Sequence, residues 1–178
     1  MSDFDGSTEY LNVHVRAYAN RLYHQERWRI LERRENSVKA LSVVLGTAAF
    51  AEIKGILPNG EVPLLPFFVF AFVVANAVSL VFQWGSKARD SAKRSAEWTQ
   101  LEKDLEKVGP RKADDEKVTA WNARAAEIEA GEPAINQHLM WRSINRACVA
   151  LGAEQEQQAK GWDYIRQNWV RPWPRAIP

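Results

Sequence analysis

The chain has 178 residues, of which 26% are charged, and its formal net charge is +2. This length suits one ordinary domain, and a net charge so close to zero argues against a nucleic-acid-binding protein. Cys148 is the single cysteine, which excludes a disulfide bond within the chain and a zinc site built from cysteines. Averages over a whole chain conceal short apolar segments.

Residues 1–39 predict an amphipathic, basic helix. Ser7 or Thr8 can cap it, and no proline or glycine follows before Gly46. Its apolar side chains recur at spacings of three and four residues, which indicates one buried helical face. These residues are Tyr10, Leu11, Val15, Tyr18 and Leu22. We expect this helix to run without a break into the first apolar segment.

Residues 40–57, ALSVVLGTAAFAEIKGIL, form a moderately apolar segment. It is uncharged as far as Ala51 and then carries Glu52 and Lys54. Beside a stronger membrane span it can cross a bilayer, because long charged side chains near the interface reach water.

Residues 64–84, LLPFFVFAFVVANAVSLVFQW, include twenty-one residues without a charge. As a helix they extend roughly 31 Å, which matches the hydrocarbon core of a bilayer. Core helices of soluble proteins rarely stay uncharged beyond about 14 residues. The linker 58–63, PNGEVP, has turn chemistry, so two spans must be antiparallel neighbours. Residues 40–84 thus predict a two-transmembrane hairpin.

Basic residues flank the predicted hairpin on both sides. By the positive-inside rule they place both termini in the cytoplasm, as expected for a multi-pass protein of the bacterial inner membrane. The residues before the first span are Arg27, Arg29, Arg33, Arg34 and Lys39, and those after the second are Lys87, Arg89, Lys93 and Arg94.

Residues 85–178 predict a helical cytoplasmic region, which makes the fold class all-α. We expect its first helix to pack beside the N-terminal helix in a bundle or coiled-coil-like stalk. Trp98, Leu101 and Leu105 lie on one face of a helix that continues the second span, and we expect them to mediate oligomerisation. Gly109-Pro110 ends this helix. Two more helices are expected at 114–130 and from Pro133 onward. The tryptophan- and arginine-rich piece 161–171 is expected to lie on the membrane surface or to pack on neighbouring helices.

Motifs for catalysis are absent from the sequence. His14, His24 and His138 lack the spacing of a metal-binding pair on one helix, and no nucleophile elbow or phosphate loop occurs. We therefore expect no enzymatic activity, no catalytic or metal-ligating residue and no cofactor.

Polar residues within the spans are the candidate functional residues. Asn76, Ser79 and Gln83 recur at one helical face of the second span, and Ser42 and Thr47 lie within the first. They can form a hydrogen-bonded seam between helices or line a water path. One hairpin cannot enclose such a path, so a channel requires several copies.

The layout of these segments is similar to that of a known protein family. A basic helix (NRLYHQERWRILERRENSVKALSVVLG), two spans and a charged helix (WGSKARDSAKRSAEWTQLEKDLE) resemble the SLATT family of two-transmembrane effectors. The resemblance implies an oligomeric effector of anti-phage defence that forms a pore or perturbs the membrane. It further implies activation by a separate partner, often a nucleotide-linked sensor, with membrane lipids as the other partner. A membrane-tethered scaffold and a constitutive small channel subunit stay open as alternatives.

Overall fold

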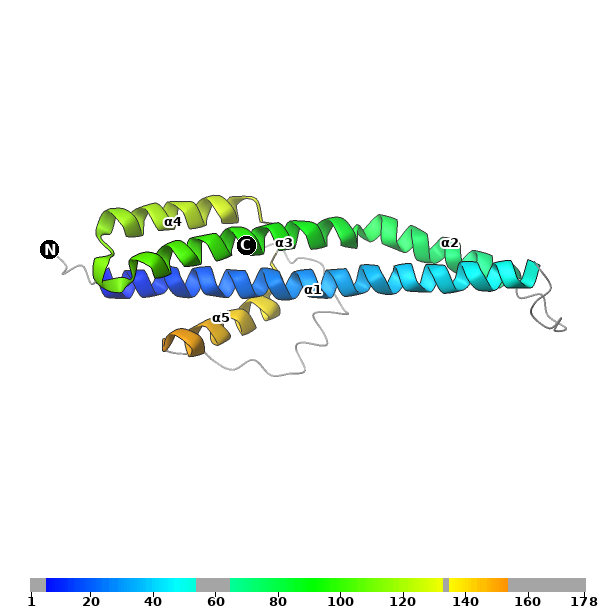
Figure 1. Cartoon of the computed structure of the whole chain (residues 1–178), viewed down its shortest axis with the longest axis horizontal. Helices are drawn as coiled ribbons and strands as arrows, with labels where there is room; N and C mark the ends of the chain where they lie inside the picture. The colour runs from blue at the N-terminus through cyan, green and yellow to red at the C-terminus, as the bar shows by residue number, and fades with distance from the viewer. Residues whose placement is uncertain (1–5, 54–64, 133–134, 154–178) are drawn as a thin grey trace, which may run out of the picture. The chain divides into compact units, whose positions relative to one another are not determined.

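A computed structural model describes residues 6–53, 65–132 and 135–153 of the chain. These residues form α-helices and one short 3-10 helix, without a strand among them, which confirms the predicted all-α class (Figure 1). The elements are α1 (Gly6–Ile53), α2 (Leu65–Phe82), α3 (Trp84–Val108), η1 (Pro110–Lys112), α4 (Asp115–Ala130) and α5 (Gln137–Leu151).

The expected uninterrupted N-terminal helix is confirmed, because α1 runs through 48 residues. The chain divides into two compact units: unit 1 comprises Met1–Arg27 with Ser91–Pro178, and unit 2 comprises Trp28–Asp90. The N-terminal part of α1 and the helices after Asp90 therefore contribute to one unit.

Unit 1 has an apolar core shared by α1, α3 and α4. Trp98 and Leu105 are completely buried at its centre, and Tyr10 donates a hydrogen bond of 3.1 Å to the carbonyl oxygen of Leu105. Spacings of three and four residues place these side chains on one face of each helix. The buried members are Tyr10, Val13 and Ala17 of α1, Trp98, Leu101 and Leu105 of α3, and Val118, Ala125 and Ile128 of α4.

The ends of the helices in unit 1 follow local rules. Gly109 has φ of +73°, a conformation that favours glycine, and ends α3 where the sequence predicted. Asp114 caps α4 through a hydrogen bond of 2.9 Å from the amide of Lys117. α5 begins at Gln137 because Asn136 caps it, and not at Pro133 as expected, so the exposed Ile135 precedes the helix.

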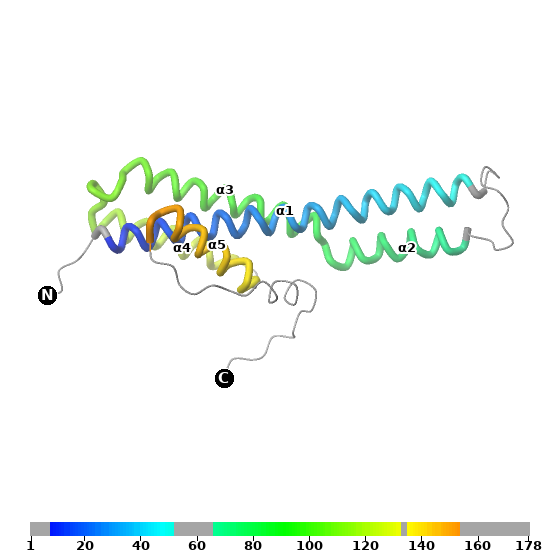
Figure 2. The backbone as a smooth tube through the Cα atoms, turned by 90° about the horizontal axis from the view of Figure 1, so that it is seen from below, coloured from blue at the N-terminus to red at the C-terminus, as the bar shows by residue number. Residues whose placement is uncertain are grey.

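Unit 2 contains the remainder of α1, all of α2 and the start of α3. Its part of α1 and α2 run antiparallel, side by side in both views (Figures 1 and 2). The contacts fix the register: Gly46 lies next to Phe72, Ser42 is bonded to Asn76, and Glu35 lies next to Gly85. The partner number falls as the number along α1 rises, as antiparallel packing requires.

α2 and α3 join at Gln83. This residue has φ of 49°, which is uncommon for a residue other than glycine. Backbone hydrogen bonds bridge the junction, from Gln83 to Ser79 at 3.0 Å and from Lys87 to Gln83 at 3.1 Å. The junction is therefore a local turn within an otherwise continuous helical path.

Candidate functional site

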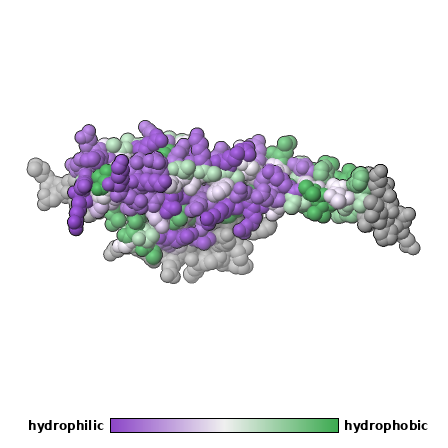
Figure 3. Space-filling view, in the orientation of Figure 1, coloured by the Kyte–Doolittle hydropathy of each residue, from purple (hydrophilic) through white to green (hydrophobic). Residues whose placement is uncertain are grey.

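Unit 2 has an extensive exposed apolar surface. Among the described residues, one helical stretch, Pro66–Val108, is long and apolar enough to cross a membrane, and only 6% of its most apolar window is buried. A core helix of a soluble protein of this composition would be largely buried. Phe70 is 69% exposed and Leu80 is 78% exposed. Figure 3 shows hydrophobic residues gathered where α2 and the end of α1 lie, at the right of the view.

The first predicted span, 40–57, forms the last part of α1 as far as Ile53, and its end lies outside the described residues. It carries exposed apolar side chains too, with Val43 68% and Phe50 58% exposed. Among the described residues, this segment is not apolar enough over the length of a membrane span, whereas the second span is. The described residues thus include one helix that is long and apolar enough to cross a membrane.

Polar side chains connect the two helices of unit 2. Nδ2 of Asn76 donates to Oγ of Ser42 at 3.3 Å and to the carbonyl oxygen of Phe72 at 2.8 Å. Oγ of Ser79 donates to a carboxylate oxygen of Glu35 at 3.0 Å. Asn76 and Ser79 therefore take part in a hydrogen-bonded seam between the helices, which is one of the two roles predicted for them.

Glu35 was not among the candidates from sequence. Its side chain is 16% exposed and also lies 3.3 Å from Lys39, four residues further along α1. A Cβ atom on Gly85 would come within 3.3 Å of this carboxyl group, so the glycine permits the close approach. Glu35 precedes the apolar segment, and only its pairing with Ser79 across the helices identifies it.

An open groove runs beside the seam, with a volume of about 500 Å³. Ser42, Thr47 and Asn76 contribute its polar lining, between apolar neighbours. Thr47 and Asn76 are exposed, and the hydroxyl of Thr47 donates to the carbonyl oxygen of Val43 at 2.8 Å. Four of the five residues predicted as pore-lining or packing residues therefore lie together on the seam or in the groove. The fifth, Gln83, lies exposed at the junction of α2 and α3.

The three residues predicted to mediate oligomerisation lie in the core of unit 1. Trp98, Leu101 and Leu105 are 0%, 3% and 0% exposed, inside the core of unit 1. Their stripe packs against α1 and α4 of the same chain, so intrachain packing accounts for the pattern. An apolar stripe alone does not tell a partner helix in the same chain from one in another chain.

Unit 1 also holds a buried polar network at the end of α4. Nε2 of His24 lies 2.8 Å from Oε1 of Glu132, and the side chains are 1% and 6% exposed. Nε1 of Trp98 donates to the same oxygen at 3.4 Å. Arg94 donates to the carbonyl oxygens of Ile128 and Gly131, which satisfies the C-terminal end of α4.

The pKa of Glu132 lies below its ordinary value. Burial alone raises it, but hydrogen bonds from His24 and Trp98 and the charge of Arg94 outweigh burial. Arg16 completes the attachment of α4 to α1 through a two-pronged ion pair with Glu129. This network positions the helices of unit 1.

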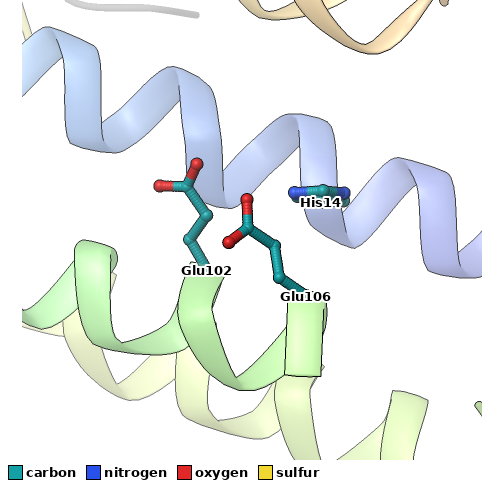
Figure 4. Close-up of side chains that lie close together, drawn as sticks. All are labelled: His14, Glu102 and Glu106. Carbon is teal, nitrogen blue, oxygen red and sulfur yellow. The ribbon is translucent and has the colours of Figure 1, made fainter. Parts of the chain in front are cut away.

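One set of side chains in unit 1 has the donor types of a metal site. His14 of α1 and Glu102 and Glu106 of α3 each offer one ligand atom, and these atoms lie within 4.8 Å of one another (Figure 4). The sequence did not reveal this set, because the histidine and the carboxylates lie about ninety positions apart along the chain.

The predicted surface piece 161–171 lies outside the described residues. No family model, no curated protein and no solved structure matches this chain.

Proposed function

We propose that this chain is an oligomeric two-transmembrane effector of the bacterial inner membrane. In this proposal the last part of α1 and α2 cross the bilayer as a hairpin, and both termini lie in the cytoplasm. Several copies assemble to form a pore or to perturb the membrane, with membrane lipids as direct partners.

The groove beside the seam is the observation that supports assembly. In hydrocarbon, an amide or hydroxyl group on the outside of a helix pair is costly unless it faces another helix or water. Asn76 and Thr47 are exposed in the single chain, on a surface that is otherwise apolar. A second copy packed on this face, or a water path between copies, would keep both side chains away from lipid.

The role in anti-phage defence depends on the resemblance to the SLATT family. In this part of the proposal, a separate partner such as a nucleotide-linked sensor acts on the cytoplasmic helices and triggers the effector. Expression in a bacterium, with membrane potential followed by a dye, tests this part: an effector depolarises the cell when its trigger is present.

Topology is tested by reporter fusions at residues 1 and 178, which should both report a cytoplasmic location. A cysteine introduced at Asn59 should react with an impermeant reagent from outside. Fusions that report opposite locations for the two ends would overturn the hairpin.

Pore formation is tested by changing Asn76, Ser79 and Gln83 together to leucine. If these residues line a water path, vesicle leakage and toxicity are lost while membrane insertion persists, because leucine favours insertion. The matched control changes Val73, Val74 and Val81 to leucine on the same helix and should leave leakage intact. Full leakage from the first triple variant would exclude this face as the conduction path.

A membrane-tethered scaffold is the second candidate. The hydrogen bonds of Asn76 to Ser42 and of Ser79 to Glu35 favour it, because they already use these groups within one hairpin. In a scaffold the triple leucine variant loosens the hairpin by about 0.6 kcal/mol per lost bond. Neither the original chain nor the triple leucine variant of a scaffold then causes vesicle leakage, and this result distinguishes a scaffold from a pore.

A further inference from the structure

His14, Glu102 and Glu106 form a compact donor set within unit 1. Glu102 and Glu106 are four residues apart on α3 and therefore point from the same face of that helix. His14 reaches them from α1, and the three ligand atoms lie within 4.8 Å of one another. In Figure 4 both carboxylates point toward α1, and one ring nitrogen of His14 faces Glu106.

His14 supplies a second observation. Its Nε2 atom is buried and has no hydrogen-bond partner among the residues that the structure describes. Buried ring nitrogens are normally satisfied by a donor, an acceptor or a metal ion. The rings of Tyr10 and His14 pack edge to face, with centroids 5.7 Å apart.

The carboxylate of Glu102 is held in place from its other side. Nε of Arg21 lies 2.5 Å from Oε2 of Glu102, whose side chain is 8% exposed. Burial raises the pKa of Glu102, and the negative charge of Glu106 raises it further, against the lowering effect of Arg21. Burial is the largest of these effects, whereas the attraction of Arg21 exceeds the repulsion between the two carboxylates. Ligating carboxylates in metal sites commonly have an outer partner, and Arg21 takes that position beside Glu102 through an ion pair.

We propose that His14, Glu102 and Glu106 bind one divalent transition-metal ion of the zinc type and so link α1 to α3. One imidazole nitrogen with two carboxylate oxygens suits zinc and its neighbours, whereas magnesium and calcium prefer oxygen ligands alone. Zinc takes such ligands at about 2.0–2.2 Å, so the ligand atoms must move together. Glu106 is exposed, which gives it the freedom to rotate and gives the ion a path from solvent.

Titration calorimetry on the full chain in detergent micelles, stripped with a chelator beforehand, measures the binding directly. We expect one zinc ion per chain and a higher midpoint of thermal unfolding with zinc chloride than without, because only the folded chain assembles the ligands. Magnesium chloride should produce neither effect. Cobalt in place of zinc should show the visible absorption of nitrogen and oxygen ligation, without a thiolate band from Cys148.

Single variants locate the site. His14→Ala and Glu106→Gln should each weaken zinc binding by about tenfold or more. Glu97→Gln, a carboxylate on the same helix but outside the set, should bind as the original chain does. Far-UV circular dichroism without metal checks that each variant is folded. Glu106→Gln should perturb folding less than His14→Ala, because Glu106 is exposed.

Absence of zinc binding in the original chain would overturn the proposal. So would binding that survives both variants, since the ion would then sit elsewhere. Both readouts are independent of membrane conductance, so they test this site whether or not the chain forms a pore.

Discussion

Nε2 of His24 on α1 lies 2.8 Å from Oε1 of Glu132, and both side chains are almost completely buried. Nδ1 of the same ring is buried without a hydrogen-bond partner among the described residues. A proton on Nδ1 would be a buried donor without an acceptor, so the geometry favours the tautomer in which Nε2 donates to Glu132. This contact joins α1 to the segment that follows α4.

Removing the histidine should destabilise unit 1. His24→Ala leaves Glu132 buried with fewer donors, and we expect a loss of about 1–3 kcal/mol in the free energy of unfolding. Urea unfolding followed by far-UV circular dichroism measures it. Glu127→Gln, on the exposed face of α4, should change it by no more than about 0.5 kcal/mol. Equal effects of the two variants would contradict a structural role for the His24–Glu132 contact.

Glu132 should contribute to the acid sensitivity of the fold. Its folded pKa lies below the ordinary value of 4.5, so its stabilisation is present above that value and is lost as the pH falls through the folded pKa. Thermal unfolding midpoints measured from neutral pH down to about pH 3 test this. Glu132→Gln should lower the midpoint at neutral pH and reduce its decline in acid, whereas Glu127→Gln should retain the original decline.

Glu102 should act in the opposite direction. Burial, aided by the charge of Glu106, raises its pKa despite the nearby Arg21. The charged form is therefore disfavoured in the fold, and protonation on lowering the pH through the raised pKa adds stability. Replacement by glutamine should remove this gain, as seen in the difference between the acid profiles of the variant and the original chain. If the unfolding midpoints of the variant and the original chain differed by the same amount at every pH, the raised pKa of Glu102 would be contradicted.

Substitutions that truncate or charge Trp98, Leu101 or Leu105 of α3 should destabilise unit 1 and not merely separate subunits. Leu105→Ala should lower the free energy of unfolding by about 2–5 kcal/mol, because Leu105 is fully buried in the core. Light scattering in detergent distinguishes this from an effect on assembly. Smaller particles with an unchanged free energy of unfolding would instead support the oligomerisation role predicted for Trp98, Leu101 and Leu105.

Glu35 should influence ion selectivity if the proposed pore exists. A carboxylate beside the seam favours cations near the entrance, so Glu35→Gln should lower the cation-to-anion permeability ratio. Reversal potentials in planar bilayers with unequal salt measure it. Glu32→Gln is the matched control, because Glu32 is exposed on the same helix and pairs with no residue of α2 in the described contacts. Conductance with an unchanged ratio would place Glu35 outside the path.

The local architecture could be predicted from the sequence because it depends on neighbouring residues. The absence of proline and glycine between Ser7 and Gly46 predicted one long α1, and Gly109-Pro110 predicted the end of α3. The uncharged run 64–84 predicted a helix suited to a membrane, and α2 has that character. Helix periodicity, turn chemistry and hydropathy all operate over a few residues.

Pairing between distant segments was decided only by the tertiary structure. The stripe of Trp98, Leu101 and Leu105 predicted oligomerisation on a helix that packs beside the N-terminal helix, and did not predict that α4 of the same chain would cover it. Glu35 became a candidate functional residue because Ser79 of the neighbouring helix donates a hydrogen bond to it. His14 became a candidate metal ligand because Glu102 and Glu106 lie close to it on another helix. A hydrophobic or polar face specifies what kind of neighbour it requires, whereas the identity of that neighbour depends on how the whole chain folds back on itself.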